Sequence, residues 1–163
     1  MNLINIGKIV NTHGIKGELR LLSNFKYKDK VFKKDMIIYI GKDKVKEKII
    51  SYRKHKQFDM ICLEGYTNIN EVLKYKGQQA YVNKEDIELA DNNYLNEDLI
   101  GLEAIVDNKV IGIVHNIEKN AQELIVIKNN DKEYLIPNND NFIKEINIKD
   151  KKIYINNIKG LLE

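Results

Sequence analysis

Apolar and polar residues alternate with a period of two along most of the chain. The alternation is clearest in the stretches LINIGKIV (3–10), ELRLL (18–22), VKEKIISY (45–52) and EAIVDNKVIGIV (103–114). This period places successive side chains on opposite faces of a strand, so each stretch predicts a half-buried β-strand. The pattern therefore indicates an antiparallel, mostly β structure.

Polar turn residues separate neighbouring strand-like runs at four points. The first is Gly41-Lys42-Asp43-Lys44, and three more lie at 107–109, 129–131 and 149–151. Two strand-like runs joined by so few residues form a hairpin. Short strands at this spacing are typical of small barrels. We therefore predict an all-β fold of two small antiparallel β-barrels joined by a linker, with one or two short helices.

The stretch NINEVLKYKG (68–77) departs from the strand pattern and predicts a helix of about two turns. Its apolar residues recur at helical spacing, at Ile69, Val72 and Leu73. Asn68 can cap the first turn, and Glu71 stands three residues later, as in a capping box. Gly77 can adopt the left-handed conformation that ends a helix.

The length of 163 residues allows one large domain or two small ones. The segment 84–93 is polar and weakly periodic, and the charge balance changes sign there. We therefore predict a first domain at 1–83, a linker at 84–93 and a second domain at 94–163.

Neither a membrane segment nor a disulfide framework is indicated. No apolar run approaches the roughly 18 residues that a membrane span needs. The N-terminal stretch MNLINIGKIV resembles a strand rather than a signal peptide. Cys62 is the single cysteine, so one chain can form neither a disulfide nor a cysteine-based metal site. We expect a monomeric cytoplasmic protein without membrane contact, in which Cys62 packs as a small apolar residue.

Positive charge is concentrated in the first half of the chain. Residues 1–90 contain 18 Lys and Arg against 11 Asp and Glu, whereas residues 91–163 contain 9 against 13. Such a basic surface attracts polyphosphate through long-range steering and counterion release, so nucleic acid is the natural partner. The alternative is that the lysines are simply solvated and reflect a compositional bias of the source genome.

The loop in NTHGIKGELRLL (11–22) carries the candidate chemistry. His13 directly precedes Gly14, and Lys16 directly precedes Gly17. Arg20 follows in the next strand. A nucleotide-binding loop requires Ser or Thr directly after its lysine and a helix beyond, and neither is present. His13 lacks a recognisable nucleophile or orienting carboxylate, and the three histidines are scattered along the chain, which does not favour zinc. A tight structural turn, a nucleic-acid or protein contact, and catalysis remain open.

Four stretches carry a resemblance to a known family. They are IGKIVNTHGIKGELRL (6–21), FDMICLEGYTNINEVLKYKGQQAYV (58–82), DLIGLEAIVDNKVIGIVHNI (98–117) and YLIPNNDNFIKEINIKDKKIYINNIKGLLE (134–163). In order and spacing they resemble the ribosome maturation factor RimM family, which has an N-terminal RimM barrel and a C-terminal PRC barrel. The resemblance covers nearly the whole chain.

The resemblance implies a non-enzymatic ribosome assembly factor without a cofactor or metal. Members of the family bind the immature small (30S) ribosomal subunit and assist maturation of its head and of 16S rRNA. Their partners are 16S rRNA and a ribosomal protein of the head, S nineteen. Two alternatives remain, namely a generic RNA-binding barrel and an rRNA-processing enzyme that uses His13 as a general base.

Two sets of residues are expected at the contacts. The rRNA or ribosome contact is expected at the opening loop and strand, at His13, Gly14, Lys16, Gly17 and Arg20. The ribosomal-protein contact is expected at Tyr94, Leu99, Ile100, Gly101, Pro137 and Phe142. The family often has two adjacent tyrosines before the second barrel, and this chain retains only Tyr94. For Tyr94 an ordinary packed aromatic, and for Pro137 a strand terminator, remain alternative interpretations. Gly101 can equally serve a backbone bend, and Phe142 the core.

Overall fold

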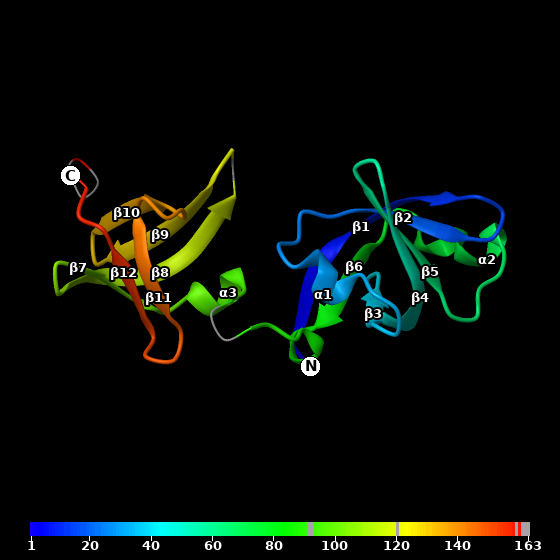
Figure 1. The fold of residues 1–163 in the computed structure, drawn as a ribbon, viewed down its shortest axis with the longest axis horizontal. Helices are drawn as coiled ribbons and strands as arrows, with labels where there is room; N and C mark the ends of the chain where they lie inside the picture. The colour runs from blue at the N-terminus through cyan, green and yellow to red at the C-terminus, as the bar shows by residue number, and fades with distance from the viewer. Residues whose placement is uncertain (91–92, 120, 159, 161–163) are drawn as a thin grey trace. The chain divides into compact units, whose positions relative to one another are not determined.

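The computed structural model divides into two compact units, Met1–Ala90 and Asp91–Glu163 (Figure 1). It describes all residues except 91–92, 120, 159 and 161–163. The described parts are almost entirely strands and turns with a few helices of one turn, so the predicted all-β class is confirmed. Among the described residues no helix is long and apolar enough to cross a membrane.

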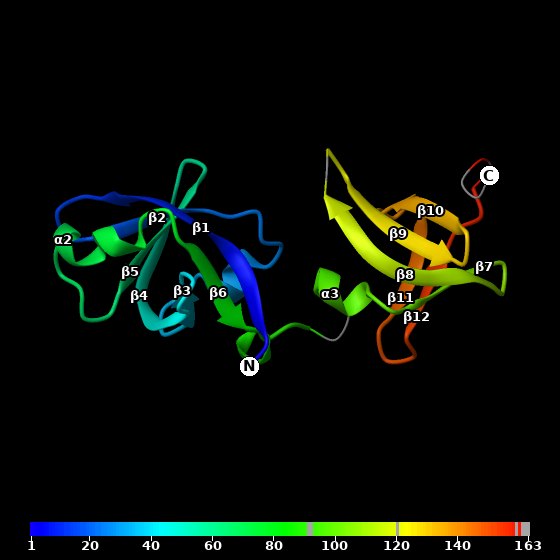
Figure 2. The same ribbon diagram turned by 180° about the vertical axis from the view of Figure 1, so that it is seen from behind.

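Six strands of the first unit form a closed barrel in the order β1-β2-β5-β4-β3-β6. They are β1 (Leu3–His13), β2 (Glu18–Leu22), β3 (Ile37–Ile40), β4 (Val45–His55), β5 (Phe58–Leu63) and β6 (Gln79–Asn83). Every pairing is antiparallel, and β6 returns to β1, beside which it runs in Figure 2. Alternate side chains, such as Leu19, Leu21 and Ile61, are fully buried.

Short helical segments connect these strands. They are α1 (Lys28–Val31), α2 (Ile69–Val72), and the 3₁₀ turns Leu73–Tyr75 and Lys84–Asp86. The predicted helix is present as α2 and the 3₁₀ turn that follows it. Asn68 accepts a hydrogen bond from the N–H of Asn70, and the Glu71 carboxylate accepts one from the N–H of Asn68. This reciprocal capping satisfies backbone donors that the first turn would leave unpaired.

The second unit contains one sheet of six strands in the order β10-β9-β8-β7-β12-β11. They are β7 (Glu103–Val106), β8 (Lys109–Lys119), β9 (Glu123–Asn129), β10 (Lys132–Pro137), β11 (Ile143–Asn147) and β12 (Lys152–Ile155). Helix α3 (Asn96–Leu99) precedes them. One face of the sheet packs into an apolar core that includes Val114, Ile127 and Ile153.

The four predicted hairpin turns all connect adjacent antiparallel strands. One pairing, however, differs from the expected antiparallel pattern, because β12 runs parallel to β7. These two strands are joined by a long connection through β8 to β11 rather than by a turn, so local sequence does not determine their direction.

The first unit also extends beyond its expected end at residue 83. The segment 84–90, expected to begin the linker, belongs to the first unit. Within it the side chain of Ile87 is buried. The buried Ile87 side chain, and the hydrogen bond from the N–H of Lys84 to the carbonyl of Asn2, show that this polar segment is part of the first unit rather than an exposed linker.

A buried carboxylate connects α1 to the barrel. Asp59 in β5 is fully buried, and its Oδ2 lies 2.9 Å from the Nζ of Lys28 in α1. The hydroxyl of Tyr52 donates a 2.6 Å hydrogen bond to Oδ1, and Lys54 Nζ lies 3.6 Å from the same oxygen. Burial, together with this carboxylate, raises the pKa of Tyr52 to about 12, so its hydroxyl remains a donor. A buried charge requires such partners because desolvation is costly.

We expect Lys28→Met to lower the free energy of unfolding by about 1–3 kcal/mol, because it removes one partner of a buried charge. The matched control is Lys34→Met, an exposed lysine of the segment that follows α1, which should change stability by less than ~0.5 kcal/mol. Urea denaturation of the two variants measures the difference. Equal stabilities would show that Lys28 does not stabilise the Asp59 carboxylate.

Candidate nucleic-acid interface

The loop between β1 and β2 is a tight turn that contains both glycines. The N–H of Gly17 donates to the carbonyl of Gly14 at 3.3 Å. His13, the last residue of β1, pairs in register with Glu18, the first residue of β2. Gly14 and Gly17 have φ values of +74° and +85°, which favour glycine. Between them Ile15 is 82% exposed and Lys16 is also exposed. The turn therefore presents its central side chains to solvent.

The two glycines differ in their surroundings. A Cβ atom at Gly17 would lie 2.9 Å from the carbonyl oxygen of Asn68, the residue that caps α2, whereas a Cβ at Gly14 would contact nothing within 4 Å. The N–H of Ile69 also donates to the carbonyl of Ile15 at 2.9 Å. Gly17 is thus required for close packing of the turn against α2, and Gly14 only for its own backbone conformation.

Arg20 lies on the outer face of the barrel and contacts His13. Its Nη2 donates to the Nδ1 of His13 at 2.8 Å, and its guanidinium lies 4.8 Å from the ring centroid of Phe58. Its Nε is buried and has no hydrogen-bond partner among the described residues. The structure therefore brings together two of the residues predicted from sequence, His13 and Arg20.

A second arginine lies on the same outer face. Arg20 and Arg53 are the register partners of Met60 on its two sides, in β2 and β4. Met60 is fully buried, which the long aliphatic stems of the flanking arginines explain. Arg53 donates two hydrogen bonds to Glu18, of 2.9 Å from Nε and 2.7 Å from Nη2. This bidentate bond is the first cause that holds the pKa of Glu18 below its usual value.

His55 completes the group. Its ring centroid is 6.1 Å from that of His13, although the two residues are far apart in sequence. Partial desolvation, and then the positive charges of Arg53 and Lys56, lower the pKa of His55. We call His13, Arg20, Arg53 and His55 the His–Arg cluster. Two of the histidines that are scattered along the chain, His13 and His55, therefore lie close together in the fold.

Sequence reasoning did not identify Arg53, His55 or Phe58 as members of this site. Their strand pattern offers a signal, because Arg53 and His55 alternate at the end of β4 and therefore share one face. This face lies beside β2 because β5 pairs with β2 on one side and with β4 on the other. The strands β2 and β5 are not neighbours along the chain, so the strand pattern alone does not indicate that they pair.

The chemistry available at the cluster is that of anion binding. The Nδ1 of His13 is bonded to a guanidinium, and the nearby Glu18 carboxylate is bonded to Arg53, so neither arrangement resembles a base oriented by a carboxylate. Among the described residues no three His, Cys, Asp or Glu side chains are placed to hold a metal ion. Guanidinium groups and imidazoles are, in contrast, suitable donors to phosphate.

The residues expected at the protein contact of the second unit occupy different environments. Leu99 is fully buried in the core because the apolar side of α3 packs inward; its place at the protein contact stays a prediction. Tyr94 and Phe142 are partly buried against the same core. Ile100 is 53% exposed, and the exposed Gly101 donates its N–H to the carbonyl of Val114.

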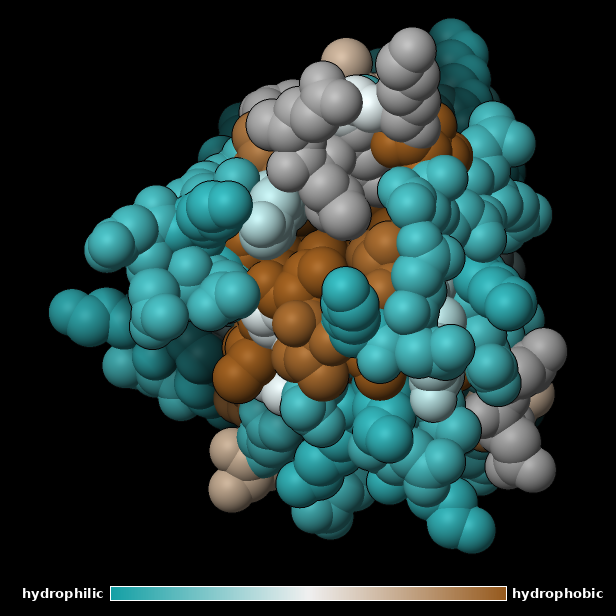
Figure 3. Space-filling model, turned by 90° about the vertical axis from the view of Figure 1, so that its left-hand side faces the viewer, coloured by the Kyte–Doolittle hydropathy of each residue, from teal (hydrophilic) through white to brown (hydrophobic). Residues whose placement is uncertain are grey.

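Pro137 belongs to an apolar strip on the outer face of β9 and β10. In register, Pro137 pairs with Leu124 and Leu135 pairs with Val126. These side chains alternate with the core residues Ile125 and Ile136, and Leu135 is 47% exposed. We call Leu124, Val126, Leu135 and Pro137 the outer strip; Val126 is buried, Leu124 and Pro137 are half-buried, and Leu135 provides the exposed area. Figure 3, which faces one end of the second unit, shows apolar side chains within a polar border.

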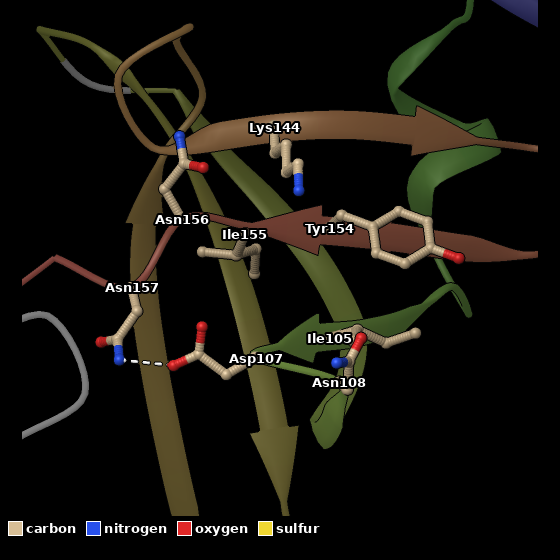
Figure 4. Close-up of a pocket in the computed structure, with 8 residues that line it drawn as sticks. All are labelled: Ile105, Asp107, Asn108, Lys144, Tyr154, Ile155, Asn156 and Asn157. Atoms are coloured by element: carbon tan, nitrogen blue, oxygen red, sulfur yellow. Dashed lines mark hydrogen bonds between the residues drawn. The ribbon is translucent and has the colours of Figure 1, made fainter.

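A small pocket lies where β7 and β12 end (Figure 4). The side chain of Asn157 donates to the carboxylate of Asp107 at 2.7 Å across its mouth, and Ile105 and Tyr154 line one side. Its volume of about 230 Å³ is below the roughly 300–1,000 Å³ of small-molecule sites. The pocket is therefore a poor candidate for a cofactor site.

Two family models together match most of the chain. The RimM N-terminal domain matches residues 4–87, and the RimM PRC barrel domain matches residues 96–161. The chain belongs to the RimM family. It is 43% identical to the ribosome maturation factor RimM of Staphylococcus haemolyticus, over 98% of this chain and 99% of that protein. It is 37% identical to the protein of the same name from an Exiguobacterium species, over 100% and 98% of the two chains.

Two solved RimM structures are also similar to this chain. The crystal structure of a RimM protein from Pseudomonas aeruginosa matches with 20% identity and a TM-score of 0.43, over 96% of this chain and 98% of that one. The solution structure of the RimM N-terminal domain from Thermus thermophilus matches with 18% identity and a TM-score of 0.47, over 55% and 98%.

We expect Gly14→Ala and Gly17→Ala to differ in stability. Both place a side chain at positive φ, which costs about 1–2 kcal/mol, but only the Gly17 variant meets the Asn68 carbonyl. That contact should add about 1–3 kcal/mol, as overpacking does. Thermal melts of the two variants test this, and a Gly14 variant as unstable as the Gly17 variant would contradict the assignment.

Proposed function

We propose that this chain is a non-enzymatic ribosome maturation factor of the cytoplasm, which binds the immature small (30S) subunit and assists maturation of its head and of 16S rRNA. The observation that supports this proposal most directly is the His–Arg cluster. It forms a cationic surface on the barrel that matches the RimM N-terminal domain. Family membership supports the ribosomal context, since the relatives are named ribosome maturation factors.

The rRNA contact is assigned to the opening turn and the His–Arg cluster. Lys16 is exposed at the tip of the turn, and Arg20 forms no ion pair with any described carboxylate. An arginine whose charge is not offset retains its attraction for phosphate. The excess of basic residues in the first unit extends this attraction beyond the contact itself.

The environment of His13 favours binding over catalysis. A general base needs a free nitrogen directed at the reacting proton and a group that orients the ring. The orienting position at Nδ1 is occupied by the Arg20 guanidinium rather than by a carboxylate. An rRNA-processing enzyme based on His13 is therefore the weaker proposal.

The contact with a head ribosomal protein, S nineteen by family resemblance, is assigned to the second unit. The outer strip offers apolar area, with Leu135 exposed and Pro137 beside it. The exposed Ile100 adds a further apolar contact. The second unit carries a net negative charge, which suits a basic ribosomal protein.

We expect the affinity for free small subunits to fall steeply with salt, by orders of magnitude between ~50 and ~200 mM if several phosphates are contacted. The double variant Lys16→Ala with Arg20→Gln should bind more weakly and reduce the salt slope by about 1–2, which corresponds to the lost contacts. Co-sedimentation at several salt concentrations measures both. The control is Lys109→Ala in the second unit. Salt-independent binding, or an unchanged slope in the double variant, would refute the rRNA contact.

We expect Leu135→Glu to abolish most binding to the purified head protein while leaving the melting temperature nearly unchanged, because the side chain is half exposed and only the partner would bury its charge. Val110→Glu is the matched control, since Val110 is 53% exposed in β8 but lies outside the outer strip. A pull-down with each variant decides the matter. Equal binding by both variants would exclude the outer strip.

A further inference from the structure

The two arginines of the His–Arg cluster carry more positive charge than Glu18, the carboxylate bonded to the cluster, can offset. Glu18 is held by both nitrogens of the Arg53 fork. Arg20 has only a neutral acceptor, the Nδ1 of His13, among the described residues. The free cluster therefore has one guanidinium charge without a counter-charge, and two imidazoles 6.1 Å apart beside it.

His13 cannot be protonated without a change in its contacts. Because arginine only donates, the 2.8 Å bond to Arg20 requires Nδ1 of His13 to be unprotonated. A proton at Nδ1 would break this bond and place an imidazolium directly against a guanidinium. In the free protein Nδ1 of His13 is therefore a hydrogen-bond acceptor.

His55 lies near basic side chains from three strands and a turn. Arg53 precedes it on β4, Lys56 follows it in the turn, His13 faces it from β1 and Arg20 from β2, and Glu18 is the carboxylate of the group. The carboxylate is already bound to Arg53. The balance of charge around His55 is therefore positive and disfavours a further cation.

We propose that the His–Arg cluster binds a phosphate of RNA together with a proton, which is taken up by the pair of rings His13 and His55. This inference rests on the proposed function and adds to it a dependence of RNA affinity on pH. In the complex, a phosphate beside Arg20 accepts the hydrogen bond that the Nδ1 of His13 accepts from Arg20 in the free protein. The released Nδ1 can then take a proton and donate to the same phosphate.

The sign of the effect follows from the two states. The phosphate charge offsets the surrounding cations that lower the pKa of His55, so this pKa is higher in the complex than in the free protein. The additional affinity is complete below the pKa of the free state and is lost as the pH rises through the pKa of the complex. In the free protein the pKa of His55 lies below the ordinary histidine value of about 6.5, so the window begins below pH 6.5 and extends up to the pKa of the complex. Lysine and arginine remain charged throughout it.

The experiment measures binding of a 3′-dye-labelled oligouridylate of about 12 nucleotides, because its uracil bases and phosphodiesters do not titrate between pH 6 and 8. We expect the full chain to bind it up to about tenfold more tightly at pH 6 than at pH 8 at constant ionic strength, since one pKa unit corresponds to a factor of ten. Calorimetry at pH 7 in two buffers of different ionisation enthalpy should show net proton uptake.

Histidine variants assign the proton. His13→Gln and His55→Gln should each reduce the ratio of the affinity at pH 6 to that at pH 8, and the double variant should abolish this dependence. His115→Gln is the matched control, because His115 is exposed in the second unit. Thermal melts verify that each variant is folded. Full pH dependence in the double variant, or its loss in the His115 variant, would overturn the proposal.

This test is separable from that of the proposed function. Salt-dependent binding that does not vary with pH would overturn the proton uptake and leave the rRNA contact standing. Absence of oligouridylate binding at both pH values would also overturn the proton-linked site, while co-sedimentation with small subunits continues to test the proposed function. Loss of both would overturn both.

Discussion

The register of β5 between β2 and β4 is the constraint on which the outer face of the first barrel depends. Met60 stands between Arg20 and Arg53, while the next residue, Ile61, faces the barrel interior with Leu19. Successive residues of a strand point to opposite faces, so a slip of one residue would exchange these two sets. The same pairing that buries the apolar residues therefore positions both arginines.

Holding several cations on one face requires compensation from neutral and apolar neighbours. Glu18 binds Arg53 through two bonds, whereas Arg20 rests on the ring of Phe58 and donates to His13. A cation over an aromatic face gains less than one paired with a carboxylate, but it leaves the charge available to a ligand. The two arginines therefore differ in how their charge is offset. Arg53 is bound to a carboxylate, whereas Arg20 has no carboxylate partner among the described residues.

Local features of the fold were predictable from sequence, whereas its long-range pairings were not. The four hairpin turns and the capped helix at Asn68 follow from residues that are neighbours in the chain. The parallel pairing of β12 with β7 and the approach of His55 to His13 join distant segments, and alternation alone does not specify which strands meet. For the same reason Leu99 could not be distinguished from the exposed Ile100 next to it, because only the packing of α3 on the sheet separates them.

The opening turn combines structural positions and proposed contact positions within five residues, which affects how substitutions in it must be interpreted. Gly17 is packed against the Asn68 carbonyl, so a side chain there displaces the turn that carries Lys16 and disturbs the start of α2. A variant at Gly17 can lose RNA affinity without removing any group that contacts RNA. Lys16 is exposed and makes no comparable contact. Removal of its charge therefore reports on binding itself, and only comparison of the two positions separates the shape of the turn from its chemistry.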